Sequence, residues 1–257
     1  MLDSTLSIEV GISTLNDGIY NPKFRDDFNY LIIHQITNDV DYSNYVETLS
    51  KNVRYIKSNT IGLSRSRNLA IENTKAKYLW IMDDDVEIHE SSFRYIENIT
   101  NKYSNVAMLV VSHSHEEIEY LPGNKEQKIN KISAASISSI DMIIKIDRLS
   151  SVRFNESFGL GAKYVSGEEY IFACDLLSNG KEIIKTRKVC TYHPLISSGQ
   201  DFYSTPIKLK TKLEMLKAAN GFIGGYLLYV LFCIKKMKII CENNAIRNVI
   251  KSFYYTS

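Results

Sequence analysis

Short runs of apolar residues, each followed by small polar or acidic residues, recur along the first half of the chain. Runs of this length, rich in β-branched side chains, are typical of strands buried on both faces of a parallel sheet. Such strands are predicted at residues 6–12, 30–36, 53–56, 78–82 and 106–111. Alternating segments at residues 131–136 and 140–146 predict two strands added antiparallel to the sheet. With helices predicted at 64–75, 90–102 and from residue 168 to Gly180, the fold class is α/β.

The run at residues 78–82 is followed at once by Asp83, Asp84 and Asp85. Ligands of α/β sheets bind at the carboxyl ends of the strands, which is where these acids fall. In an extended chain Asp83 and Asp85 would point to one side and Asp84 to the other. Three adjacent carboxylates repel one another unless a cation or hydrogen-bond donors neutralise them, and oxygen ligands suit Mg²⁺ or Mn²⁺. The alternative is a loop in which one Asp caps the next helix and the others face water.

Two arginines mark the helix predicted at residues 64–75, whose expected cap is Ser64. Arg65 and Arg67 lie in its first turn, where cations oppose the helix dipole, so a bound anion would explain them. The i+3/i+4 spacing puts Arg67 on the apolar face, where a guanidinium needs an acid or a phosphate as partner. The acids at 83–85 are the obvious candidates, and the alternative is that Arg67 reaches past the helix end to solvent.

These residues carry a family resemblance. Residues 62–68, followed by 78–85, resemble the nucleotide-sugar-binding half of family 2 glycosyltransferases of the GT-A fold, of the bacterial cell-envelope or capsule type. That family has a basic, Arg-Asn helix start and a hydrophobic strand that ends in an Asp-x-Asp motif. Three later segments resemble, in order, its glycine loop, its acceptor-side acid pair and its late histidine: residues 154–161, Glu168 with Glu169, and His193. The resemblance covers residues 8–194 and implies a Rossmann-like, mixed and mostly parallel sheet flanked by helices.

The resemblance implies an inverting transfer of sugar from a nucleotide-diphosphate sugar, for which we expect a UDP-sugar, to a hydroxyl of a glycan or lipid-linked acceptor. Mn²⁺ or Mg²⁺ would be held chiefly by Asp85, with Asp83 and His193 as further ligands. Donor contacts are implied for Thr14, Asn16, Asp39, Arg67, Asp83 and Asp84. In the family the second acid of a Glu-Asp pair is the general base. Glu169 is therefore the first candidate and Glu168 the second, although Glu here replaces the usual Asp and reaches one methylene further.

Without the resemblance, each of the later residues has an ordinary interpretation. Glu168 and Glu169 open a helix, where acids stabilise the dipole. His193 follows a short predicted strand, and a lone histidine is by default structural, although a nearby divalent ion would make it a plausible ligand. His113 and the glutamates after it are expected to form an exposed loop rather than a metal site.

Composition and charge set limits on the function. With 44% apolar and 23% charged residues the chain can build a core, and a net charge of +2 argues against a general nucleic-acid binder. The charge is unevenly divided: residues 208–257 contain nine Lys or Arg and two Glu, and the rest contains 22 Lys or Arg and 27 acids. The four cysteines have no metal-site spacing, which favours a reducing compartment, and the first residues predict no secretory signal.

The C-terminal segment contains an uncharged run at residues 221–234, followed by Lys235, Lys236 and Lys238. As a helix the run would reach about 21 Å, short of the ~30 Å hydrocarbon core of a bilayer. Its flanking lysines predict an interfacial segment on an anionic cytoplasmic leaflet, and the alternative is a core helix packed on the catalytic domain. We expect a catalytic domain over residues 1–205 and a helical appendage over residues 206–257, peripheral on the inner face of the cell membrane.

Two other functions fit parts of this pattern. A nucleotidyltransferase also uses acids and Mg²⁺ on an α/β sheet, but it needs no acceptor-side acid pair and releases pyrophosphate. An inactive, membrane-bound partner subunit is the second, and the intact acids at every motif argue against it.

Overall fold

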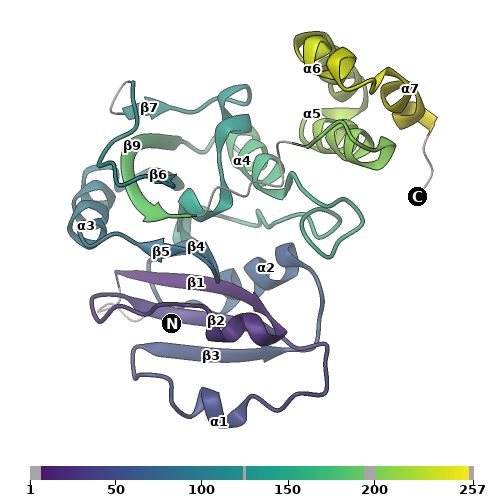
Figure 1. The fold of residues 1–257 in the computed structure, drawn as a ribbon. Helices are drawn as coiled ribbons and strands as arrows, with labels where there is room; N and C mark the ends of the chain where they lie inside the picture. The colour runs from purple at the N-terminus through teal and green to yellow at the C-terminus, as the bar shows by residue number, and fades with distance from the viewer. Residues whose placement is uncertain (1–6, 124–125, 194–200, 255–257) are drawn as a thin grey trace.

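The computed structural model describes residues 7–123, 126–193 and 201–254 (Figure 1). The first four strands form a parallel sheet with the order β3-β2-β1-β4, which confirms the predicted α/β architecture. These strands are β1 (Ile8–Leu15), β2 (Asn29–Gln35), β3 (Val53–Ser58) and β4 (Tyr78–Asp83). Because they are parallel, their carboxyl ends meet at one edge, and Ser13 of β1 is in register with Asp83 of β4.

The sheet continues beyond β4 in the order β8-β6-β9-β5, with β7 also paired to β9. Strand β8 is antiparallel to both β4 and β6, as predicted for the segment at 140–146, whereas β6 and β9 are parallel. The added strands are β5 (Glu87–Ile88), β6 (Met108–Ser114), β7 (Glu126–Lys128), β8 (Met142–Lys145) and β9 (Ile183–Tyr192).

The strand predicted at residues 131–136 is wrong. This segment contains a 3₁₀ turn, η2 (Ser133–Ser136). The Oδ1 atom of Asn130 accepts hydrogen bonds from the backbone N–H groups of Ile132 and Ser133. Such local bonds give the backbone an alternative to strand pairing, and they outweigh the alternating pattern here.

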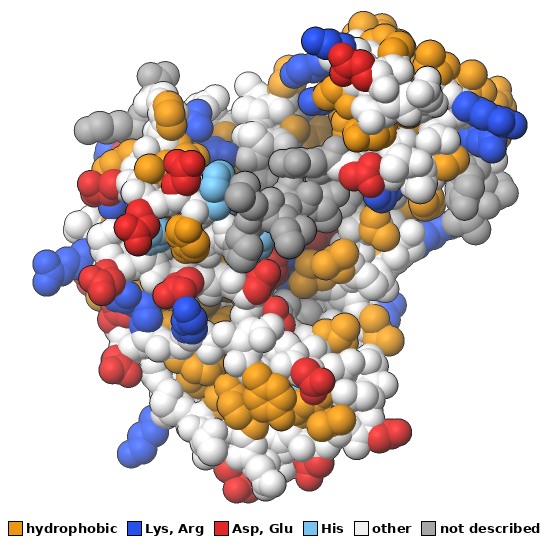
Figure 2. Space-filling model, viewed as in Figure 1, with side chains coloured by type: hydrophobic (Ala, Val, Ile, Leu, Met, Phe, Trp, Pro, Cys, Tyr) orange, Lys and Arg blue, Asp and Glu red, His pale blue; other side chains and the backbone are white. Residues whose placement is uncertain are grey.

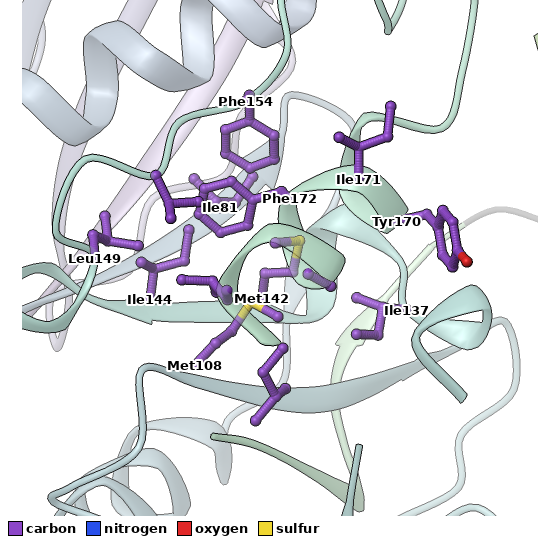
Figure 3. Close-up of a cluster of buried hydrophobic side chains, with 14 of the residues drawn as sticks. Ile81, Met108, Ile137, Met142, Ile144, Leu149, Phe154, Tyr170, Ile171 and Phe172 are labelled. Atoms are coloured by element: carbon purple, nitrogen blue, oxygen red, sulfur yellow. The ribbon is translucent and has the colours of Figure 1, made fainter. Parts of the chain in front are cut away.

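Helices cover both faces of the sheet. Because successive side chains of a strand point to opposite faces, each strand contributes residues to two cores. Leu31 and Ile81 face a core covered by α2 and α4, whereas Ile32 and Trp80 face a core covered by α3. In the first core Phe154 stacks on Phe172 of α4, with ring centroids 4.2 Å apart (Figure 3). The helices that accompany the sheet are α1 (Ser43–Val46), α2 (Leu63–Asn73), α3 (Ser92–Lys102) and α4 (Glu168–Ser178). The other 3₁₀ turns are η1 (Asn16–Tyr20), η3 (Ser139–Asp141) and η4 (Ile146–Arg148).

The expected cap of α2 is also wrong. Gly62, with φ 123°, holds the N-cap position of α2, and no side chain caps this helix. Ser64 instead donates a hydrogen bond from Oγ to the carbonyl oxygen of Phe158, at 2.6 Å. The hydroxyl therefore fixes the segment at 154–161 against α2.

Three helices follow the sheet and form a group of their own in Figure 1. They are α5 (Pro206–Lys235), α6 (Met237–Glu242) and α7 (Ile246–Tyr254). Gly221 interrupts α5 with non-helical angles, φ 74° and ψ 171°, and divides it into two arms. The arms pack on each other and on α7 around a separate apolar cluster that includes Leu213, Tyr229 and Ile240.

Candidate active site

The three acids at the end of β4 and in the turn that follows, Asp83, Asp84 and Asp85, have three different partners. Asp83 accepts a hydrogen bond from Arg67 at 3.1 Å, Asp84 accepts one from Thr14 at 2.5 Å, and Asp85 lies 3.7 Å from Nε2 of His193. The extended chain that would put Asp83 and Asp85 on one side is not present, because β4 ends at Asp83 and the chain turns at the next two residues. Each acid therefore contacts a different part of the site.

Asp84 is held in the turn rather than exposed to solvent. Thr14, buried at the end of β1, donates to its Oδ2 atom. A Cβ atom at Gly18 would lie 2.2 Å from the same oxygen, so only glycine leaves room for this carboxylate. Burial raises the pKa of Asp84, and the negative neighbours Asp83 and Asp85 raise it further, against the lowering effect of the Thr14 hydrogen bond.

Arg67 joins the donor side of the site to α4. Its side chain is only 1% exposed, and it donates from Nη1 to Glu168 at 2.8 Å and from Nη2 to Asp83 and to Ser139. Burial lowers the pKa of Arg67, but the surrounding carboxylates outweigh it and leave the pKa above the ordinary value. The prediction that Arg67 lies inward is confirmed, and the solvent-facing alternative is wrong. Its partners in this structure are the acids Glu168 and Asp83, so the phosphate contact implied for Arg67 stays a prediction.

Glu168 and Glu169 are adjacent at the start of α4 but have different surroundings. Glu168 is tied to Arg67, whereas no hydrogen bond from a described side chain reaches Oε2 of Glu169. Burial and the neighbouring Glu168 raise the pKa of Glu169 to about 7. Oε2 of Glu168 and Nε of Arg67 are also buried without a partner among the described residues. Three unpartnered polar atoms in one cluster suit a place where a polar ligand binds.

The glycine loop at residues 154–161 packs against this cluster. Asn68 of α2 donates to the carbonyl oxygen of Phe154 and accepts from its N–H group. Gly159 has φ 105°, and a Cβ atom there would lie 3.2 Å from Cδ of Glu168. The loop, α2 and α4 thus fix one another, and the glycine allows the backbone to approach the acid closely.

The expectation that His113 lies in an exposed loop is wrong, and this histidine lies beside the site. His113 belongs to β6, and its Nδ1 lies 3.1 Å from both carboxylate oxygens of the buried Asp141. Its ring is 6.1 Å from the ring of His193. The hydrogen bond to Asp141 raises the pKa of His113. The signal that could have found it is period 2, because His113 continues the face of the buried Leu109 and Val111.

The donor set suits a hard divalent cation that also binds a diphosphate. Among the described residues no group of three or more His, Cys, Asp or Glu converges on one point. The Asp85 carboxylate and the His193 imidazole do approach each other, at 3.7 Å. Mg²⁺ uses one or two carboxylates and completes its shell with water and substrate phosphates, so this pair fits the expected ion. Asp83 remains partly exposed beside Arg67 and could add an oxygen.

The remaining predicted donor contacts lie at the ends of β1 and β2. The side chain of Asn16 exchanges two hydrogen bonds with Thr37, so it links the two strand ends. Asp39 lines a cavity of about 530 Å³ beside β2 and β3 that does not reach the acids after β4. The cavity lining is Ile36, Asn38, Asp39, Val40, Asp41, Tyr42, Ser43, Val46, Glu47, Tyr55 and Lys57.

Residues 39–158 match the sequence family described as "Glycosyl transferase family 2". The resemblance to family 2 is confirmed. The matched stretch contains Asp39, Arg67, the three acids after β4 and most of the glycine loop, and it ends before Glu168 and His193. Glycosyl transfer is therefore the class of function that the match supports. No curated protein matches the chain significantly.

Solved structures with the family 2 fold are similar to this chain at low sequence identity. S. aureus TarS 1-349 in complex with UDP matches with a TM-score of 0.55 and 15% identity over 84% of this chain and 67% of that one. The complex of the same fragment with UDP-GlcNAc matches with a TM-score of 0.56 and 12% identity, over 83% and 66%. The chain spans only 40% of the longer TarS structure. These similarities confirm the GT-A fold.

Proposed function

We propose that this protein is a metal-dependent, inverting glycosyltransferase. It moves a sugar from a UDP-sugar to a hydroxyl of a glycan or lipid-linked acceptor. The family match supports the reaction class, and the UDP and UDP-GlcNAc complexes of TarS support the donor class. The observation that carries the proposal is the difference between the two acids of α4. Glu168 is paired with Arg67, whereas Oε2 of Glu169 is buried without a partner among the described residues, and the pKa of Glu169 is raised to about 7.

Glu169 is the general base in this proposal. A base is most effective when its pKa lies near the working pH, and the surroundings of Glu169 bring it there. The carboxylate takes the proton of the acceptor hydroxyl as the acceptor oxygen bonds to the anomeric carbon. The bond from that carbon to the diphosphate oxygen breaks, and the diphosphate leaves with the bonding electrons. Attack from the face opposite the leaving group inverts the configuration.

Other residues of the chain position the two substrates. Glu168 and Asp83 share Arg67, so the ion pairs fix the base helix relative to the end of β4. Asp85 and His193 would hold Mn²⁺ or Mg²⁺, which when bound neutralises charge on the leaving diphosphate. The cavity beside Asp39 is the candidate place for the nucleoside.

The test is turnover of nucleotide sugars with Mn²⁺ or Mg²⁺, measured as release of nucleoside diphosphate. Glu169→Gln keeps size and hydrogen bonding but removes the proton acceptor, so turnover should fall by about 10²–10⁴-fold with donor affinity unchanged. EDTA should weaken donor binding, and Asp85→Ala should abolish turnover in a folded protein.

Several outcomes would contradict parts of this assignment. Full activity in EDTA would exclude the metal site, and an active Glu169→Gln beside an inactive Glu168→Gln would exchange the two roles. Release of pyrophosphate would identify a nucleotidyltransferase. Absence of turnover with every nucleotide sugar would favour an inactive partner subunit.

A further inference from the structure

The second arm of α5 carries an apolar stripe that faces away from the protein. Ile223, Leu227, Leu231 and Ile234 recur at helical spacing, and each is at least 60% exposed. We call these four residues the outward stripe. The last helix, α7, repeats the feature with the exposed residues Ile246, Ile250 and Tyr254. Figure 2 shows apolar side chains gathered over these helices, with lysine and arginine side chains beside them.

The exposure of the outward stripe is not a consequence of loose packing, because the opposite side of the same arm is packed. Tyr229 and Cys233 are buried in the cluster between α5 and α7. The Tyr229 hydroxyl is 2.7 Å from the Ser252 hydroxyl of α7. A Cβ atom at Gly225 would lie 2.4 Å from Cα of Lys217, so the two arms of α5 are in backbone contact. The arm is thus apolar on both sides, and among the described residues only one side has a protein partner.

Among the described residues α5 is the one helix long and apolar enough to span a membrane, and 22% of its most apolar window is buried. Two observations argue that it does not span. Gly221 breaks the helix, and the arm at residues 222–235 reaches only about 21 Å, against a hydrocarbon core of ~30 Å. Insertion would also expose Tyr229 and the partners it has in α7.

The charges around the outward stripe indicate what covers it. Residues 221–254 contain five Lys or Arg and one acid. Lys235 and Lys238 lie just beyond the stripe, and both are exposed. A second copy of this chain is a poor occupant, since a twofold contact would bring the same cations of both copies together. An anionic bilayer has an apolar interior that could bury the outward stripe and a negatively charged surface that would attract the neighbouring lysines.

We propose that the outward stripe and the exposed face of α7 dock this protein on the surface of an anionic lipid membrane. The first arm of α5 is packed on α4, the helix that begins with Glu168 and Glu169. Asn220 donates to the Tyr170 hydroxyl at 3.2 Å, and a Cβ atom at Gly167 would lie 2.7 Å from Cγ of Met215. Docking therefore carries the acid pair to the lipid surface. This part rests on the proposed function, and it favours a lipid-linked acceptor.

The experiment is flotation of the full-length protein with phosphatidylcholine vesicles that contain or lack phosphatidylglycerol, which needs no enzymatic activity. Binding should require the anionic lipid and fall at high salt. Leu227→Gln with Leu231→Gln should weaken it at least about tenfold, because these side chains would be buried in the bilayer. Lys235→Gln and Lys238→Gln should each weaken it about fivefold. Ile132→Gln is the matched control, since Ile132 is 84% exposed outside these helices, and it should bind as the unaltered protein does.

Three outcomes would overturn the proposal. The leucine variant could bind as well as the control, or the unaltered protein could be extractable from vesicles only with detergent. The protein could also form a dimer in sedimentation that the leucine changes dissociate and that does not bind vesicles. Failure of glycosyl transfer alone would leave the docking result standing. If the protein docks on vesicles but is active only on soluble acceptors, the lipid-linked acceptor is excluded and the proposal of membrane docking stands.

Discussion

The centre of the catalytic region and the C-terminal helices depart from ordinary protein structure in opposite ways. The centre buries charged side chains, with Arg67 between the buried Glu168 and the partly exposed Asp83. The helices expose apolar side chains such as Leu227 and Leu231 at regular spacing. Both departures cost free energy in the isolated protein, since buried charges lose hydration and exposed apolar surface orders water. The difference between the two regions supports the two proposals, a polar ligand at the centre and a lipid surface at the helices.

The largest expected loss of stability follows from removing the buried cation, Arg67. Arg67→Met leaves Asp83 and Glu168 without their cation, and the free energy of unfolding in urea should fall by about 3–5 kcal/mol. Arg65→Met is the matched control, because Arg65 also pairs with a glutamate, Glu156, but with both side chains 49% exposed. Its effect should be about 0–1 kcal/mol. Equal effects of the two variants would mean that burial adds nothing to the Arg67 ion pairs.

The next effect concerns the contact between the arms of α5. Gly225→Ala places a methyl group against the backbone of Lys217 and should destabilise the helices by about 1–3 kcal/mol. The neighbouring Gly224→Ala meets only an ordinary contact with Asn220, and it should stabilise by about 0.5–1 kcal/mol through helix propensity. Thermal unfolding compares the two variants. A harmless Gly225→Ala would show that the arms are not in close contact.

A further effect, gradual with pH, is the pH dependence of stability contributed by Glu169. Its pKa rises from 4.5 in the ordinary state to about 7 in the folded protein, so between these values the folded state holds the proton that the unfolded state has lost. This contribution to stability is present below pH 4.5 and is lost as pH rises to about 7, with a slope of at most about 1.4 kcal/mol per pH unit. The free energy of unfolding in urea, measured at several pH values for the unaltered protein and for Glu169→Gln, should differ by this contribution. The activity of the unaltered enzyme should rise over the same limb as the base loses its proton. A pH-independent difference between the two proteins would exclude the raised pKa.

The smallest effect should come from the outward stripe. Leu231→Gln changes an exposed position to a good helix former, so the free energy of unfolding should stay within about 0.5 kcal/mol. Unfolding in urea without vesicles measures it. A loss of several kcal/mol would mean that Leu231 is packed on the protein, and the contrast between the two regions would disappear.

Much of the fold could be predicted because the strands are buried on both faces. An apolar run such as residues 78–82 leaves few alternatives, and the parallel order then places its acidic end beside the ends of β1 and β2. Segments with weaker hydrophobic patterns were harder to predict. At residues 131–136 the alternation was outweighed by the side chain of Asn130, and at Ser64 the best capping residue bonded to a distant carbonyl instead of its own helix.

The site was predictable in its members more than in its pairings. The sequence indicates that Arg67 lies inward, but its link to Glu168 joins residues 101 positions apart, which no local pattern reveals. The different states of Glu168 and Glu169 depend on this pairing, so their order as base could come from the sequence only by resemblance. The place of His113 in β6 was not predicted because its polar neighbours suggested a loop, and its partner Asp141 lies 28 positions later, in the 3₁₀ turn η3.

The bridge made by Arg67 also has a consequence for how the chain folds. The Arg67 guanidinium must leave water together with the Glu168 carboxylate, 101 positions away in the sequence, while Asp83 stays partly exposed. A half-made bridge would leave a charge buried without compensation. The end of β4 and the start of α4 should therefore lock together in one late, cooperative step. A fragment that stops at Phe158, where the family match ends, would contain Arg67 and Asp83 without Glu168. We therefore expect the candidate site to be completed only when the fold itself is complete.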